Sequence, residues 1–474
     1  MTRLCHLPIK SLRLVQRTLS TGLKAAYWHI NRQTNASITH VSSLHFLIHF
    51  IYPRLPYRQI MIQDLLNVCG FDDNVNLSDA LLSLRVNIGK FTDCIVTDPS
   101  ATVDDTSFIL PNEIQITGSK SESNRLLILQ KLFGNIEIKN ISNSQDTNLL
   151  QKALNSDEKT IDILHAGTAM RFLTSFFAVQ EGAEKILTGS ERMKQRPIKP
   201  LVEALRELGA DIEYLENEGF PPLKIKGKKL EKNFVEIPAD ISSQFITSLI
   251  LVGGKLENGL TINLLGEITS KPYIEMTLKL LSEISGKSII LKDKTIQIPN
   301  IKTQKTVFIV ESDWSSASYF YSFSALDRQK ITLKNFNKNS LQGDSRITEI
   351  YSQFFGIDTI FNENQQKITL IPKNNFSLPQ SIQLNMNDCP DIAQTICVMA
   401  AALKIPFEIG GLGTLKIKET DRLSALQNEL KKIGCKTEIT DNSIKSVLYT
   451  NPKKNISITT YGDHRMAMAF APYS

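Results

Sequence analysis

The stretch ITGSKSESNR, residues 116–125, decides how the rest of the chain is read. The pattern predicts a short strand before Gly118 and a helix over the apolar run 126–133. This order gathers backbone N–H groups, serine hydroxyls and the positive end of a helix dipole at one point, where Lys120 and Arg125 add two cations. We expect a site for phosphate or carboxylate here. A serine N-cap beside a solvated lysine and arginine explains this stretch alone equally well.

The net charge of +6 arises in one terminal segment. Residues 1–63 carry eight Lys and Arg and no acidic residue, which leaves 46 basic and 48 acidic residues in the rest. A nucleic-acid partner is therefore not expected. The composition of 1–63 suits an organellar transit peptide or translated non-coding sequence. We expect 1–106 to be an N-terminal extension and the folded core to begin near Ser107.

The sequence indicates neither a metal nor a membrane span. Its six cysteines show no CxxC or paired ligand spacing, so reduced thiols are expected. No apolar run reaches the length of about 20 residues that a membrane helix needs. P-loop and GxGxxG fingerprints are absent as well. We expect cofactor-free group transfer between anionic small molecules in the cytoplasm, or in a plastid if 1–63 is a transit peptide.

An internal repeat predicts an α/β fold. Helices opened by small or polar residues recur at 119–133, 166–180, 240–252, 312–326, 388–403 and from 461 onward. A strand, a polar loop and an amphipathic helix follow at 136–154, 186–208, 260–284, 331–355 and 407–433. The polar-opened helix occurs six times, and the strand–loop–helix segment occurs five times. We therefore expect six like units, with the last half-unit missing.

The loops that enter these helices hold a large share of the hydroxyl and charged residues. The loops that hold candidate binding or catalytic residues are 166–171 (AGTAMR), 191–197 (ERMKQRP), 242–244 (SSQ), 270–273 (SKPY), 418–422 (KETDR) and 463–465 (DHR). Arginines suit phosphate and carboxylate, and a lysine with carboxylates suits proton transfer. Each loop alone has a structural explanation: Asp463 as an N-cap, Glu419 and Arg422 as an ordinary helical pair, His464 as an interior histidine. Six equivalent loops together favour a cleft for ligands with several negative charges.

At these motifs the chain resembles the enolpyruvyl transferases, and among them the EPSP synthases, from about residue 109 to 472. The resemblance implies a two-domain enolpyruvyl transferase fold with three βαβαββ units per domain, an inside-out α/β barrel. Domain 1 would comprise 107–118 plus 312–474, and domain 2 would comprise 119–311, with a hinge near Gly118 and Glu311. The implied reaction moves the enolpyruvyl group of phosphoenolpyruvate to the 5-hydroxyl of shikimate 3-phosphate, a step in chorismate and aromatic amino acid biosynthesis.

The resemblance also implies roles for individual residues. Asp391 would accept a proton, Glu419 would donate one, and Lys120 would stabilise charge. Shikimate 3-phosphate would contact Lys120, Ser121, Arg125, Ser242, Ser243, Gln244, Ser270, Asp391 and Lys418. Phosphoenolpyruvate would contact Lys120, Gly167, Arg196, Gln244, Arg422 and Arg465. No metal or cofactor is implied, and a monomer is expected.

Three positions depart from the family pattern: His165 and Thr414 stand where many members have asparagine, and Phe172 where many have proline. Two alternatives remain open. One is a truncated, non-catalytic homologue. The other is the sister reaction on UDP-N-acetylglucosamine, which depends on a Lys-Asn pair and a loop cysteine. Lys120-Ser121 and the absence of cysteine between Cys94 and Cys389 argue against the second.

Overall fold

One unit of strand, helix, strand, helix and two antiparallel strands repeats along the chain. Its first complete copy consists of β3 (Thr160–Asp162), α7 (Gly167–Ala178), β4 (Glu184–Thr188), α9 (Lys199–Glu207), β5 (Asp211–Tyr214) and β6 (Leu223–Lys226). The short helix α8 (Glu191–Lys194) precedes α9. Strands β3 and β4 are parallel, and β6 lies antiparallel between β4 and β5, which gives the order β3-β4-β6-β5.

The computed structural model describes residues 113–452 and 456–473, all within one compact unit. The expectations for 1–106 and for the start of the core near Ser107 lie outside the described residues. Within the described ranges, no helix is both long and apolar enough to cross a membrane.

Two further copies have the same order of strands. The second consists of β7 (Phe234–Pro238), α10 (Ser243–Gly253), β8 (Leu260–Leu265), α11 (Lys271–Ser285), β9 (Leu291–Lys292) and β10 (Thr295–Ile298). The third consists of β15 (Ile382–Asn385), η3 (Pro390–Ile392), α14 (Ala393–Ala402), β16 (Phe407–Gly410), η4 (Gly413–Ile417), α15 (Arg422–Lys432), β17 (Cys435–Ile439) and β18 (Ser443–Tyr449). The α/β class and the alternation predicted from the sequence are confirmed.

The remaining strands pair across long stretches of the chain. Strand β1 (Ile114–Gln115) is parallel to β12 (Ile331–Lys334), and β11 (Thr306–Ile309) is parallel to β2 (Ile136–Lys139). The sheet of β1 and β12 also contains β13 (Ile357–Asn362) and β14 (Lys367–Pro372), with η2 (Glu363–Gln365) between them. The helices not yet named are α5 (Lys120–Phe133), α6 (Gln145–Leu154), α12 (Trp314–Asp327), η1 (Gly343–Arg346), α13 (Ile347–Phe354), α16 (His464–Phe470) and η5 (Ala471–Tyr473). Each of these two sheets therefore joins segments that lie far apart in the chain.

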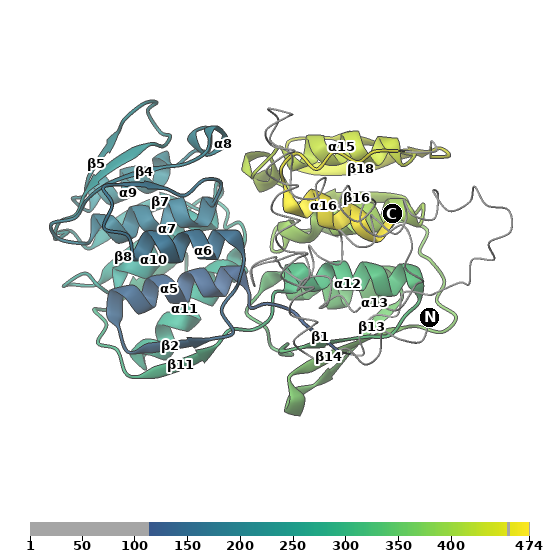
Figure 1. Ribbon diagram of the computed structural model, residues 1–474, viewed down its shortest axis with the longest axis horizontal. Helices are drawn as coiled ribbons and strands as arrows, with labels where there is room; N and C mark the ends of the chain where they lie inside the picture. The colour runs from purple at the N-terminus through teal and green to yellow at the C-terminus, as the bar shows by residue number, and fades with distance from the viewer. Residues whose placement is uncertain (1–112, 453–455, 474) are drawn as a thin grey trace, which may run out of the picture. The chain divides into compact units, whose positions relative to one another are not determined.

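The core is built from helices that are apolar on nearly every side. Helix α10 is buried almost throughout because α5, α7, α9 and α11 all contact it. A helix that is apolar all round belongs in an interior, and its sequence SQFITSLILVG fits that position. Figure 1 shows α5, α7 and α10 side by side, with β2 and β11 at the edge of the same group. Lys120 and Ser121 of α5, Thr168 of α7, and Ser243 and Gln244 of α10 lie at the openings of these helices, so functional groups gather at the helix starts.

The chain passes twice through one narrow crossing, where Gly118 and Ser312 form an antiparallel bridge. A Cβ on Gly118 would lie 1.9 Å from the carbonyl oxygen of Asn140, so only glycine fits. The Asp313 carboxylate accepts hydrogen bonds from the backbone N–H of Lys120 at 3.3 Å and of Ser316 at 2.8 Å. One side chain thus caps α12 and meets the first residue of α5. The crossing lies where the hinge was expected, and the two-domain boundaries stay a prediction.

Candidate active site

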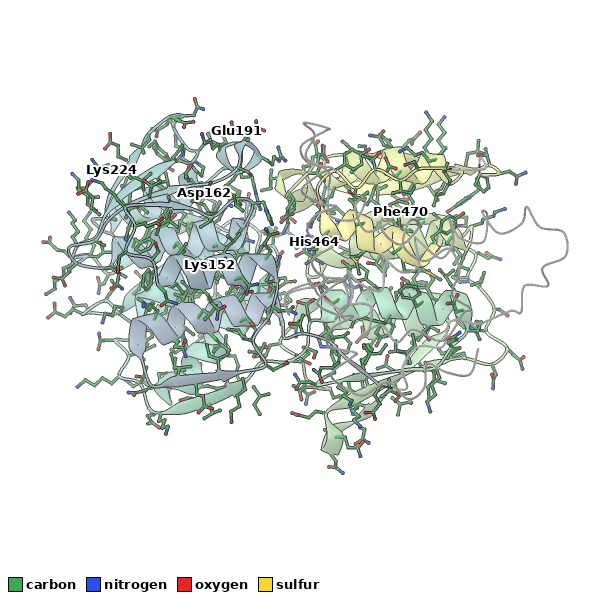
Figure 2. All side chains as sticks on the ribbon, in the orientation of Figure 1. Lys152, Asp162, Glu191, Lys224, His464 and Phe470 are labelled. Carbon is green, nitrogen blue, oxygen red and sulfur yellow. The ribbon has the colours of Figure 1, made fainter. Side chains whose placement is uncertain are left out.

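One pocket collects every site residue that the sequence predicted. It is lined by Lys120, Ser121, Arg125, Gly167, Arg196, Ser242, Ser243, Gln244, Ser270, Asp391, Lys418, Glu419, Arg422 and Arg465. These residues come from the starts of α5, α7, α10, α11, α15 and α16, from the loops before them, from the loop between α8 and α9 (Arg196) and from η3 (Asp391). Because the starts converge, their free N–H groups and positive dipole ends face the same space. Figure 2 labels His464 and Phe470, which mark the two ends of α16.

The opening of α5 is both a cap and part of the pocket. The Ser119 hydroxyl accepts from the Glu122 N–H at 3.4 Å, as the N-cap explanation predicts. Arg125 is not solvated, however, because it is only 3% exposed. Its guanidinium donates to the Ser121 carbonyl at 2.6 Å and to the Thr277 hydroxyl at 2.8 Å. Burial, only partly offset by nearby groups, lowers the pKa of Arg125 to about 10, so a bound anion would stabilise its charged form.

The opening of α7 brings an arginine against a glycine. A Cβ on Gly167 would lie 2.4 Å from Nη1 of Arg196, so the guanidinium occupies the space that any larger residue would need. Arg196 is 5% exposed, and its Nη1 donates to the carbonyl of His165 at 3.5 Å. Burial lowers the pKa of Arg196, with Glu419 acting in the opposite direction. A cation that is buried, underpartnered and open to the pocket is suited to binding an anion.

Neutral donors line the side of the pocket formed by α10 and α11. The Ser242 hydroxyl caps α10 by accepting from the Gln244 N–H at 3.3 Å, and the Gln244 amide donates to Thr168 at 3.3 Å. Ser270 adopts the left-handed conformation with φ 52°, and its N–H donates to the carbonyl of Asn387 at 3.1 Å. These hydroxyl and amide groups suit phosphate oxygens and sugar-like hydroxyls.

Asp391 lies among three cations on the opposite side of the pocket. Its Oδ1 is 3.0 Å from Nη1 of Arg422 and 3.3 Å from Nζ of Lys418. Its Oδ2 is 3.4 Å from Nη2 of Arg465. Burial acts to raise the pKa of Asp391, but the charges of Arg465, Lys418 and Arg422 hold it well below its usual range. The carboxylate is therefore ionised and can accept a proton.

A second carboxylate, Glu419, is held by the same arginine. Its Oε2 lies 2.7 Å from Nη2 of Arg422, whose Nε donates to Asp463 at 2.7 Å. Burial acts to raise the pKa of Glu419, and the charges of Arg422 and Arg196 hold it well below its usual range. Asp463 also caps α16, accepting from the Arg465 N–H at 2.9 Å. The N-cap explanation of Asp463 is thus correct, whereas Glu419 pairs with Arg422 from the loop before α15 and not within a helix. Both acids still line or brace the pocket.

Arg192 links two parts of the pocket that lie far apart in the chain. Nη2 of Arg192, in α8, donates to the carbonyls of Lys416 and Lys418 at 3.3 Å each. Backbone contacts of this kind fix the path of the 416–418 loop, and with it the direction of the Lys418 side chain.

Comparisons with known proteins show the family of this chain. A family model described as EPSP synthase (3-phosphoshikimate 1-carboxyvinyltransferase) matches residues 150–472, more than half of the chain. The chain belongs to the EPSP synthase family.

Curated relatives of the EPSP synthase family span most of this chain. A 3-phosphoshikimate 1-carboxyvinyltransferase of Bacteroides fragilis is 44% identical over 363 residues, covering 76% of this chain and 87% of the relative. One of Haemophilus influenzae is 36% identical over 400 residues, covering 76% and 88%. A solved EPSP synthase structure from Acinetobacter baumannii has a TM-score of 0.57 at 20% identity, covering 76% of this chain and 88% of that chain. This likeness confirms the predicted enolpyruvyl transferase fold.

Several pocket residues were not among the predicted contacts of an EPSP synthase. Among them are Asp146, Tyr273 and Phe172. Tyr273 lies in the stretch 270–273, three residues after the predicted contact Ser270. The sequence therefore held a signal that Tyr273 also lines the pocket. Asp146 resembles an ordinary acid in the first turn of a helix, and nothing local distinguishes it.

The departures from the EPSP synthase pattern are also at the site. Thr414 lines the pocket, and its buried hydroxyl has no hydrogen-bond partner among the described residues. The Arg125 guanidinium lies 5.6 Å from the centre of the Phe172 ring, a cation–π contact. His464 is exposed rather than interior, so the interior-histidine explanation is wrong.

Within the described ranges, no group of three or more His, Cys, Asp or Glu is arranged to hold a metal ion. The cysteines there, Cys389, Cys397 and Cys435, are free and buried. The expectation of reaction without a metal or cofactor stays a prediction.

Proposed function

We propose that this chain transfers the enolpyruvyl group of phosphoenolpyruvate to the 5-hydroxyl of shikimate 3-phosphate. The products are 5-enolpyruvylshikimate 3-phosphate and inorganic phosphate, in the biosynthesis of chorismate and aromatic amino acids. One observation supports this reaction above all: cations and hydroxyls suited to two phosphates and a carboxylate line a single pocket in a member of the EPSP synthase family.

The pocket offers two sets of donors, one for each substrate. For shikimate 3-phosphate we assign Lys120, Ser121, Arg125, Ser242, Ser243, Gln244, Ser270, Asp391 and Lys418. For phosphoenolpyruvate we assign Lys120, Gly167, Arg196, Gln244, Arg422 and Arg465. The first set is rich in hydroxyls and the second in arginines. This division suits a polyhydroxylated ring phosphate on one side and a compact trianion on the other.

Asp391 is the proposed proton acceptor. The methylene carbon of phosphoenolpyruvate gains a proton, the 5-hydroxyl oxygen bonds to C2, and its proton passes to Asp391. The resulting tetrahedral adduct then loses a proton from the methyl carbon and expels phosphate, which restores the double bond. Asp391 suits the first half because it is ionised and because its cationic neighbours hold it in place.

Glu419 is the proposed proton donor, and it is ionised in the arrangement described here. Its pKa is held down by Arg422 and Arg196, both of which we assign to phosphoenolpyruvate. Once substrate anions neutralise these arginines, burial is offset only by the weaker effects of Lys120 and Lys418, and the pKa of Glu419 rises. Substrate binding therefore supplies the condition under which Glu419 holds a proton to donate.

Lys120 lies between the two substrate sets and stabilises the charge on the adduct. Fixed cations in a water-poor pocket are the main source of rate enhancement in such a mechanism. All of these residues come from one chain, so we propose a monomer, which light scattering of the purified chain would test. The cytoplasmic location, with a plastid as the alternative, rests on residues outside the described ranges and stays a prediction.

The test is phosphate release by the purified full-length chain. With phosphoenolpyruvate and shikimate 3-phosphate we expect turnover, and with UDP-N-acetylglucosamine as acceptor we expect none. Asp391→Ala should abolish turnover while circular dichroism shows a folded protein. Release with the sugar nucleotide instead would assign the sister reaction. A folded wild type that is inactive with both acceptors would favour a non-catalytic homologue.

A further inference from the structure

Asp146 shares its carboxylate between two side chains at the pocket wall. It lies in the first turn of α6, and its side chain is 10% exposed. Oδ2 is 3.3 Å from the Lys120 ammonium, and Oδ1 is 3.6 Å from Nε2 of His165. The first contact is a charge-assisted hydrogen bond, and the second is too long for a hydrogen bond. Three elements, α5, α6 and the loop before α7, therefore meet at one carboxylate.

We propose that Asp146 is a positioning residue that holds the Lys120 ammonium at the point where the two substrates meet. The proposal rests on the role assigned to Lys120 under the proposed function. A lysine ammonium is a compact charge on a flexible stem with three rotatable donors. Within the described part of the chain, Asp146 is the one hydrogen-bond partner of this ammonium, so the other donors face the pocket.

The charges around Lys120 explain why a carboxylate is needed. Arg465 faces the same pocket and repels the ammonium. Burial acts to lower the pKa of Lys120, but Asp146 opposes it most strongly, followed by Glu419 and Asp391, and the pKa is raised. Glu419 and Asp391 already form ion pairs with Arg422. Substrate anions would compete with these two carboxylates for the same guanidinium. Asp146 has no arginine partner among the described residues, so it remains available to Lys120 throughout the reaction.

His165 supports the carboxylate from its other side. Its imidazole lies beside Oδ1 of Asp146, while its backbone carbonyl accepts from Arg196. One residue thus links the carboxylate that holds Lys120 with the arginine assigned to phosphoenolpyruvate. In many members an asparagine stands here, whose amide is a hydrogen-bond donor.

The test compares Asp146→Asn with a matched control, Asp211→Asn. Asp211 pairs with Lys226 at 3.8 Å on β5 and β6, both side chains are exposed, and neither lines the pocket. In the full-length chain, Asp146→Asn should lower kcat about 100-fold, the effect of a misplaced catalytic group. It should also move the alkaline limb of the kcat profile to lower pH, because the carboxylate that raises the pKa of Lys120 is removed. The control should change neither.

A readout independent of turnover separates this proposal from the proposed function. Lysines are reductively methylated with ¹³C-formaldehyde, and the Lys120 signal is assigned by its loss in Lys120→Arg. In Asp146→Asn the titration midpoint of that signal should fall, while in Asp211→Asn it should stay at the wild-type value. An unchanged midpoint in Asp146→Asn overturns the positioning role even if the enzyme is active. An inactive wild type with a shifted midpoint would contradict the reaction and leave the Asp146–Lys120 link supported. If Asp146→Asn does not fold, Asp146→Glu, which keeps the charge, should restore folding and the midpoint; a lowered midpoint there overturns the proposal.

Discussion

Replacing Gly167 by alanine adds one methyl group to the wall of the pocket and should damage phosphoenolpyruvate binding without unfolding the protein. The new Cβ would lie 2.4 Å from Nη1, 2.6 Å from Nη2 and 2.7 Å from Cζ of Arg196. Ordinary contacts between heavy atoms are about 3.5–4.0 Å. The guanidinium must therefore move by about 1 Å or more. A displacement of that size in a binding or catalytic group can cost about 100-fold in rate.

Gly167→Ala should weaken phosphoenolpyruvate binding and slow turnover, but it should not lower the stability of the protein. The group that must move is the end of a flexible side chain, and alanine is a better helix former than glycine in the first turn of α7. We expect the melting temperature to stay within a few degrees of wild type. The KM for phosphoenolpyruvate should rise about 10- to 100-fold, while the KM for shikimate 3-phosphate changes little, because Arg196 is assigned only to the former.

Steady-state phosphate release at varied concentrations of each substrate provides the measurement. Gly410→Ala is the matched control, since a Cβ there meets no atom within 4 Å. If Gly167→Ala leaves the KM for phosphoenolpyruvate unchanged, or raises both KM values equally, the assignment of Arg196 to this substrate is refuted.

Three other changes test separate parts of the site. Asp391→Asn keeps the shape but removes the proton acceptor, and kcat should fall by about 100- to 10,000-fold in the phosphate-release assay. Arg192→Ala removes both hydrogen bonds to the 416–418 loop, so the KM for shikimate 3-phosphate should rise about 10-fold in steady-state kinetics. Burial, reinforced by the charge of Glu311, raises the pKa of Glu122 to about 8. The native state then holds a proton that the unfolded state loses, so stability should fall as pH rises from about 4.5 towards 8. Glu122→Gln should remove this fall, which urea unfolding at several pH values measures.

Each of these has a result that contradicts it. An active Asp391→Asn would mean that another group accepts the proton. An unchanged KM in Arg192→Ala would show that the loop holds Lys418 without help. If Glu122→Gln leaves the slope of stability against pH unaltered between pH 5 and 8, then Glu122 is already ionised in the folded protein.

The helix starts could be predicted from sequence because their signals are local. Ser119, Ser242 and Asp463 are N-caps whose side chains bond the first turn of the same helix. Apolar periodicity then sets the extent of each helix, and α5, expected at 119–133, spans Lys120–Phe133. Each opening could therefore be recognised within about five residues of sequence.

The electrostatics of the site could not be predicted in this way. Arg125 looked as exposed as any helical arginine, yet it is buried against Thr277, far along the chain. The Lys120–Asp146 pair depends on how α5 and α6 pack, and the crossing at Gly118 depends on strands that pair although they lie far apart in the chain. Such contacts are set by tertiary packing, so no local pattern reports them. The resemblance to a family supplied the residues but not their charge partners.

The proposed transfer of the enolpyruvyl group is tested most directly by ³¹P NMR of a single mixture. Full-length protein is incubated with equal amounts of phosphoenolpyruvate and shikimate 3-phosphate. We predict that the phosphoenolpyruvate signal is replaced by inorganic phosphate, while the ring phosphate is retained and shifts as the 5-hydroxyl becomes an enol ether. Unchanged signals from both substrates in the presence of folded protein would contradict the account.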